Sequence, residues 1–286
     1  MLMNMKDLLK VANENNFAIP AFNISDYSMF IGVMDTCEKT NSPVIIEIHP
    51  LELDFTGTDL VEAIIKRAYK SSVPICLHLD HCGDYGKIIY AIQAGFTSVM
   101  FDGSSLPFEE NIAGVRKIVE IAHPANVSVE AELGTIGSTD AQAEAGATQI
   151  IYTDSDDAAK FVEETGVDTL AVAIGTSHGL YPAGMQPKLR LDILKEIKAK
   201  VNIPLVLHGG SGNSDEEVGQ AVALGINKVN ISSDMKEAYY RKMREVLKDE
   251  SLREPNILQP PCIEAMQEVV EHKLTLFQTI GKAALY

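Results

Sequence analysis

Three of the seven histidines share one local setting, because a glycine follows each of them within two residues: they are His81, His178 and His208. Three neutral imidazoles that leave one coordination position open are typical ligands of a catalytic zinc ion. None of the four cysteines forms a C-x-x-C pair, so no thiolate zinc site competes with this one. A structural role is the interpretation for His78, His123 and His272. The three histidines can act together only if the fold brings them to one place.

The elements that must position them repeat along the chain as a short apolar run, a turn and a longer amphipathic stretch. Eight runs predict strands: Ala18–Asn23, Pro43–Ile48, Val73–Leu79, Ser98–Phe101, Val127–Glu132, Thr169–Ala173, Leu205–Leu207 and Lys228–Ile231. Helices are predicted between them, for example at Tyr27–Lys39, Asp59–Tyr69, Phe108–Ile121, Asp156–Glu164, Leu191–Ala199 and Asp215–Leu224. Eight alternating units favour a closed (β/α)₈ TIM barrel over an open sheet. The 286 residues fit one such domain, residues 1–286, with an extra C-terminal helix from about Ile263 to Ile280.

In such a barrel the active site lies at the C-terminal ends of the strands. A polar or ionisable residue stands at or just after every predicted strand end: Asn23, Glu47, His49, Asp80, His81, Asp102, Ser104, Glu130, Glu132, His178, His208, Asn230, Ser232, Ser233 and Asp234. A barrel needs no polar residues there, so the pattern indicates a site. Asp80, directly before His81, is placed for proton transfer. Asp102 and Glu132 could orient the metal ligands through hydrogen bonds, or hold a second cation.

Glycine and serine follow the last two predicted strands, in the GGSG run at 209–212 and at Ser232 and Ser233. Because the final two loops of such barrels commonly bind phosphate through backbone N–H groups, these residues and Gly179 predict a phosphate cradle. The long segment from Gly134 to Thr148 is rich in small residues and is interpreted as a mobile lid.

Composition excludes two classes of partner. The formal net charge of −16 disfavours nucleic acid, because an acidic surface repels phosphate backbones. No apolar run approaches the roughly 20 residues that span a bilayer. The first 16 residues do not resemble a signal peptide, and the cysteines are expected to be buried thiols, so we expect a cytoplasmic protein.

The motifs together resemble the class II fructose-bisphosphate and tagatose-bisphosphate aldolases along nearly the whole chain. The landmarks are PAFN (20–23), SPVII (42–46), LHLDH (77–81), FDGSSLPFEEN (101–111), VEAELG (129–134), YTD (152–154), LAVAIGTSHGLY (170–181), PLVLHGGSG (204–212) and KVNIS (228–232). The resemblance implies a zinc-dependent lyase of carbohydrate metabolism. It would cleave a phosphorylated sugar, a ketose 1-phosphate or 1,6-bisphosphate, to dihydroxyacetone phosphate and an aldehyde. It also implies a monovalent cation (Na⁺ or K⁺) near the phosphate and a homodimer or homotetramer.

Residue roles follow from the same resemblance. His81, His178 and His208 would bind zinc, and Asp80 would exchange the proton of the aldehyde-derived hydroxyl. Asn230 would bond to the hydroxyl of dihydroxyacetone phosphate, while the phosphate would be held by Gly179, Gly209, Ser211, Ser232 and Ser233. The family's loop glutamate, which moves the second proton, corresponds by position to Asp140, with Glu144 as the alternative.

Several positions depart from the family pattern on the side of the aldehyde. Glu47 and His49, which with Asn23 would face that fragment, replace a usual glutamine and small hydroxyl residue. After Tyr181 the chain continues with Pro182, and a lysine comes only at Lys188. Where the family usually has Asp-Pro-Arg, the residues at 254–256 are Glu-Pro-Asn, with Arg253 just before them. These differences predict an aldehyde pocket without the usual cations, and an aldehyde that is unphosphorylated or otherwise unusual.

Two rival hypotheses stay open at this point. Lys228 has the same strand parity as Asn230, so it could form a Schiff base in a class I aldolase. Alternatively, the barrel is a non-catalytic or partner-dependent aldolase-like subunit, against which the intact Asp80–His81 pair argues.

Overall fold

The strands close into a barrel, as predicted. The computed structural model describes residues 1–139, 150–182 and 187–286. Its barrel strands pair in parallel in the order β1-β10-β9-β7-β5-β4-β3-β2. Their bounds are β1 Ile19–Asn23, β2 Val44–Ile48, β3 Ile75–Leu79, β4 Ser98–Phe101, β5 Ser128–Leu133, β7 Thr169–Val172, β9 Leu205–Leu207 and β10 Ile226–Ile231. Every predicted strand is matched to within two residues at each end, which confirms the (β/α)₈ barrel.

The inside of the barrel is filled in layers. Side chains alternate along a strand between the interior and the surrounding helices, so residues two apart face the same way. Near the N-terminal end, Ile45 and Cys76 pack with helix α1 (Met5–Glu14). This helix contacts β3, β5 and β10 and so closes that end. Two residues further along the same strands come Glu47 and His78, which are paired in register and fully buried. The interior therefore changes from apolar to charged toward the C-terminal end.

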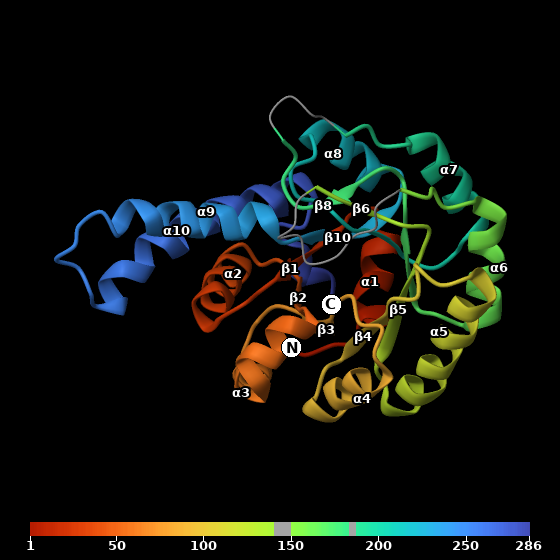
Figure 1. The fold of residues 1–286 in the computed structure, drawn as a ribbon, viewed down its shortest axis with the longest axis horizontal. Coiled ribbons are helices and arrows are strands. Elements are labelled where there is room, and N and C mark those ends of the chain that lie inside the picture. Colours follow the sequence, from red (N-terminus) through yellow and green to blue (C-terminus); the bar gives the residue numbers. More distant parts are fainter. Residues whose placement is uncertain (140–149, 183–186) are drawn as a thin grey trace.

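Helices surround the barrel (Figure 1). They are α2 Tyr27–Lys39, α3 Pro50–Ala68, α4 Tyr85–Ala94, α5 Phe108–Ala122, α6 Ser155–Thr165, α7 Leu191–Lys200, α8 Asp215–Ala223 and α9 Ser233–Val246. The helices α1, α4 and α9 lie outside the predicted ranges. Helix α3 begins at Pro50 instead of Asp59, because the His49 side chain accepts the N–H of Leu51 and proline suits the first helical turn. Gly57, with φ 64° and ψ −164°, interrupts it, so only its second half follows the predicted periodicity.

Part of the predicted lid is held by hydrogen bonds. Strand β6 (Gly137–Ser138) pairs in parallel with β8 (Ser177–His178), and Thr135 forms an antiparallel bridge with Ile151. These contacts fix the stretch 134–139 beside the barrel mouth. The rest of the predicted lid, with Asp140 and Glu144, lies outside the described residues.

Helices α9 and α10 (Pro255–Leu276) run side by side and project from the barrel as an arm (Figure 1). The C-terminal helix begins eight residues before the predicted start, and Pro260 and Pro261 lie inside it. Proline removes backbone hydrogen bonds from a helix, but this end of α10 is largely exposed, so water can satisfy the freed carbonyls. Within the described residues, no helix is both long and apolar enough to cross a membrane.

Candidate metal centre and active site

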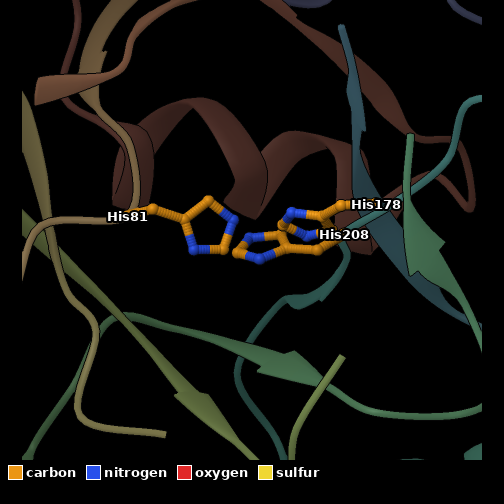
Figure 2. Close-up of side chains that lie close together, drawn as sticks. All are labelled: His81, His178 and His208. Atoms are coloured by element: carbon orange, nitrogen blue, oxygen red, sulfur yellow. The ribbon is translucent and has the colours of Figure 1, made fainter. Parts of the chain in front are cut away.

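The three predicted ligand histidines meet at the C-terminal mouth of the barrel. His81 follows β3, His178 belongs to β8 and His208 follows β9. The ring centroid of His81 lies 4.8 Å from that of His178 and 4.5 Å from that of His208. The ring centroids of His178 and His208 are 6.3 Å apart. Figure 2 shows the three rings turned toward one shared space from different strands. One nitrogen from each ring lies within 4.8 Å of the others, a spacing that one metal ion can bridge.

His81 is aimed by its backbone and by a carboxylate. Its φ of 46° is left-handed, a conformation that costs energy for a residue with a side chain. Its Nδ1 lies 2.9 Å from Oδ2 of Asp102. The other oxygen of Asp102 accepts hydrogen bonds from the N–H and the hydroxyl of Ser104, at 3.1 and 2.7 Å. Such carboxylate contacts fix the tautomer and the orientation of a metal-binding imidazole.

His208 is fully buried between two carboxylates of β5. Its Nδ1 lies 2.8 Å from Oε2 of Glu132, and its Nε2 lies 2.8 Å from Oε1 of Glu130. Because the two glutamates are two residues apart on one strand, both face the barrel interior. Glu130 was recognised in the sequence only as a polar residue near a strand end, although its shared parity with Glu132 was the available signal.

The donor set fits a divalent cation. Nε2 of His178 is buried and has no hydrogen-bond partner among the described residues, which is expensive unless a ligand satisfies it. Four carboxylates surround the three rings: Asp80, Asp102, Glu130 and Glu132. Imidazole nitrogens close to acidic groups suit zinc and related transition metals.

The pKa values describe a site that attracts positive charge. Burial opposes protonation of His81, but Asp80 and Asp102 outweigh it and raise the pKa to about 10. Burial and the neighbouring His81 also oppose protonation of His208, yet Glu130 and Glu132 raise its pKa to about 9. Burial, with the positive charge of the other two histidines, holds the pKa of His178 well below its usual value. A cation in the shared space would therefore replace protons on two rings.

Asp80 stands beside the histidines as a buried anion. Burial alone would raise the pKa of its carboxyl, but His81, His208 and Lys228 hold it well below the usual value. Its Oδ2 accepts a hydrogen bond from the amide of Asn23 at 2.8 Å, and its Oδ1 accepts one from the amide of Asn230 at 3.1 Å. Oδ1 of Asn230 is buried and has no partner among the described residues, so it can accept a hydroxyl of a ligand. The carboxylate is thus held rigidly in its unprotonated form.

Lys228 is bound too tightly to act as a nucleophile. It is fully buried, and its Nζ lies 2.9 and 2.8 Å from the two oxygens of Glu130. It also forms an ion pair with Oε1 of Glu47 at 2.7 Å, without hydrogen-bond geometry. Burial opposes its charge, but the two glutamates raise its pKa above the ordinary value. Because a Schiff base needs the neutral amine, this geometry disfavours the class I hypothesis.

A cavity of about 580 Å³ opens beside the metal centre. Ten of the predicted site residues line it: Asn23, Asp80, His81, His178, Gly179, Gly209, Ser211, Asn230, Ser232 and Ser233. The glycine-rich loop after β9 is tightly constrained, because a Cβ at Gly209 would lie 2.6 Å from the carbonyl oxygen of Ser177. The first turn of α9 begins at Ser233, on the cavity wall. Loop and helix N-terminus together form the kind of cradle that binds phosphate.

The outer wall of the cavity differs from the one predicted. Glu47 and His49, which were expected in the aldehyde pocket, do not line the cavity. Glu47 faces Lys228 inside the barrel, and His49 caps α3. The outer wall comes instead from α3, from the segment after β8 and from α9, through Leu51, Glu52, Leu180, Lys236, Glu237, Tyr240 and Arg244. The contribution of α9 was missed because that helix was not predicted. Two cations, Lys236 and Arg244, therefore stand on this wall.

Comparisons with known proteins agree with this geometry. Residues 3–282 match the family described as fructose-bisphosphate aldolase class II. The chain is 37% identical over 99% of its length to a 6-phospho-5-dehydro-2-deoxy-D-gluconate aldolase of Halalkalibacterium halodurans, covering 98% of that protein. It is 38% identical over 94% of its length to the D-tagatose-1,6-bisphosphate aldolase subunit GatY of Klebsiella oxytoca, covering 95% of it. The crystal structure of the YdjI aldolase from Escherichia coli K12 superposes with a TM-score of 0.86 at 34% identity, over 99% of this chain and 100% of that one.

Proposed function

This chain belongs to the class II fructose-bisphosphate aldolase family, and from that premise we propose that it is a zinc-dependent aldolase for a phosphorylated ketose. The reaction is the reversible cleavage of a ketose 1-phosphate or 1,6-bisphosphate to dihydroxyacetone phosphate and an aldehyde. One observation carries the proposal: two of the three convergent histidines, His81 and His178, line the same cavity as a buried aspartate anion and a phosphate-type cradle, and His208 lies against them.

His81, His178 and His208 would hold the zinc ion. When bound, it would supply the positive charge that polarises the carbonyl of the ketose. Asp102 and Glu132 would keep the rings of His81 and His208 in place through the contacts at 2.9 and 2.8 Å. Because zinc would take one nitrogen of His208, the contact of Nε2 with Glu130 at 2.8 Å would give way to the metal, and Glu130 would stay paired with Lys228.

Asp80 would be the general base in the direction of cleavage. Its carboxylate removes the proton of the C4 hydroxyl, the C4–O bond becomes the aldehyde carbonyl, and the C3–C4 bond breaks. The electron pair of that bond passes to C3 and toward the C2 carbonyl, and C3 is then protonated to give dihydroxyacetone phosphate. Asp140, or Glu144, is the proposed donor of this second proton.

The dihydroxyacetone phosphate half would lie against the cradle. Gly179, Gly209 and Ser211, with Ser232 and Ser233 at the start of α9, line the cavity where its phosphate would bind. Asn230 offers its free Oδ1 to a hydroxyl group of the same fragment. A monovalent cation, Na⁺ or K⁺, near this phosphate is part of the proposal, and rates measured in K⁺ and tetramethylammonium salts test it.

The aldehyde half would extend from Asp80 and Asn23 toward the outer wall. The two named relatives act on a sugar bisphosphate and on a phosphorylated sugar acid. Lys236 and Arg244 could meet a negative group at that end, although Glu52 lies 3.5 Å from Lys236 and offsets part of its charge. An unphosphorylated or unusual aldehyde is the alternative, since no lysine follows Tyr181 until Lys188 and Asn256 stands where the family usually has arginine.

Two further expectations accompany this proposal. We expect a homodimer or homotetramer, and size-exclusion chromatography with light scattering tests it. We also expect a cytoplasmic location, which the four buried free cysteines support, because reducing compartments keep thiols free.

A panel experiment tests the proposed function. The protein receives dihydroxyacetone phosphate and a set of phosphorylated, acidic and neutral aldehydes, with and without EDTA, and condensation rates are ranked. Condensation that EDTA abolishes and zinc restores supports the proposal. Fully zinc-loaded protein without turnover on the whole panel would instead favour a non-catalytic or partner-dependent subunit.

A further inference from the structure

A lysine of the C-terminal arm is buried close to the cradle. Lys273 belongs to α10, and only 5% of the residue is exposed. Its Nζ lies 2.8 Å from Oδ2 of Asp234, in the first turn of α9. Lysines are almost never buried to this extent without a paired charge. The ion pair therefore connects α10 to the start of α9.

Asp234 in turn holds the glycine-rich loop. Its second oxygen, Oδ1, accepts the backbone N–H of Gly212 at 3.1 Å. Its own backbone N–H donates to the hydroxyl of Ser211 at 3.3 Å. Gly212 has a φ of 72°, so the loop at this point adopts a backbone that few other residues tolerate. A chain of direct contacts thus runs from Lys273 through Asp234 to the loop that lines the cavity.

The negative charge of Asp234 would repel a phosphate bound by this loop, and the ammonium of Lys273 offsets that repulsion. The carboxylate of Asp234 touches a loop whose proposed ligand is a phosphate dianion, and like charges at short distance repel in a poorly screened site. The ammonium of Lys273 neutralises the carboxylate and leaves its hydrogen bond to Gly212 intact. The loop can then be held by an acidic side chain without losing its attraction for an anion.

We propose that Lys273 is a positioning residue that sets the affinity of the cradle for phosphate by neutralising Asp234. This inference rests on the proposed function, because it takes the cradle as the site of the dihydroxyacetone phosphate. Lys273 itself touches neither the cavity nor the metal centre. It lines a second cavity of about 370 Å³ on the other side of α9, together with Arg241, Glu268 and His272.

The test uses four variants of the full-length protein: Lys273→Met, Lys273→Arg, Asp234→Asn and the double variant Lys273→Met/Asp234→Asn. Arg241→Gln is the matched control, because it removes a cation from the same second cavity without touching a described ion pair. Three quantities are measured with glyceraldehyde as acceptor: KM for dihydroxyacetone phosphate, KM for glyceraldehyde and the inhibition constant of inorganic phosphate. Zinc content and Tm are recorded for each variant.

We expect Lys273→Met to raise KM for dihydroxyacetone phosphate and the inhibition constant of phosphate by at least about fivefold, the usual lower range for coupled sites. KM for glyceraldehyde and the zinc content stay within twofold of wild type. Lys273→Arg and Arg241→Gln keep phosphate binding, and the double variant recovers at least half of the loss, because the uncompensated carboxylate is gone. Asp234→Asn alone binds phosphate at least as tightly as wild type, which keeps the test decisive if Lys273→Met is too unstable to purify.

Three results would overturn the inference: unchanged phosphate binding in folded Lys273→Met, no recovery in the double variant, or an equal loss in Arg241→Gln. If the wild-type protein uses dihydroxyacetone phosphate and Lys273→Met behaves identically to it, only the role of Lys273 is refuted. If the wild-type protein neither uses dihydroxyacetone phosphate nor binds phosphate, both the proposed function and this inference are refuted.

Discussion

Replacing Lys228 by methionine tests the buried charge layer beneath the metal centre. The substitution keeps a side chain of similar length but removes the ammonium from two fully buried carboxylates, those of Glu47 and Glu130. Removing one partner of a buried ion pair costs about 3–5 kcal/mol, because an uncompensated charge stays behind. At about 2 °C for each kcal/mol in a domain of this size, we expect Tm to fall by roughly 6–10 °C.

The assay is thermal unfolding of the metal-free protein at neutral pH, followed by circular dichroism. Lys242→Met is the control, because Lys242 pairs with Glu245 on the exposed surface of α9, where such pairs contribute less than about 1 kcal/mol. Adding Glu130→Gln to Lys228→Met should recover part of the lost stability, since the ionised carboxylate that Lys228 neutralises disappears. Glu47→Gln should recover little, because burial and the neighbouring Asp80 raise the pKa of Glu47 to about 8. A Lys228→Met protein as stable as wild type, or a Lys228→Met/Glu130→Gln protein with no recovery, would refute the reasoning.

Further predictions concern the metal and the opposite end of the barrel. Asp102→Asn should weaken zinc binding by about 10–100-fold, because His81 loses the carboxylate that orients it; competition with a fluorescent chelator measures this. His208→Ala should abolish turnover and weaken zinc binding, whereas Asp80→Ala should abolish turnover and retain the metal; an active Asp80→Ala protein would remove that residue from its role. Asp168→Ala should cost about 1–3 kcal/mol of unfolding free energy, since the buried N–H of Val129 loses its acceptor at 2.8 Å. Its kcat should not change, because it lies in the turn before β7, at the closed end of the barrel.

Much of the fold could be predicted because its signals are local. Helix α2 was predicted at its observed bounds, where Asp26 caps its first turn by accepting the N–H of Met29. The strands end where apolar runs meet polar residues, and this placed His81 and His208 correctly at the mouth. Helix α9 was not among the helices predicted by range, although Ser232, Ser233 and Asp234 are residue types that favour the first turn of a helix.

Contacts across the barrel could not be predicted, because they depend on how the sheet closes. Glu130 and Lys228 are 98 residues apart in sequence, yet they form the buried pair behind His208. His178 is held by β8, a two-residue strand whose partner β6 lies in the segment that the sequence predicts to be a mobile lid. The outer wall of the cavity also depended on α9, so the nature of the aldehyde pocket was the least predictable part of the site.

The central claim is metal-dependent carbon–carbon bond cleavage at the three histidines. The most direct measurement follows release of dihydroxyacetone phosphate from tagatose 1,6-bisphosphate, fructose 1,6-bisphosphate and fructose 1-phosphate with a coupled dehydrogenase. It compares EDTA-treated protein before and after addition of one equivalent of zinc, in parallel with protein treated with borohydride plus substrate. We predict turnover of at least one of these sugars that disappears with EDTA, returns with zinc and survives borohydride. Turnover that survives EDTA and is lost to borohydride would contradict the account.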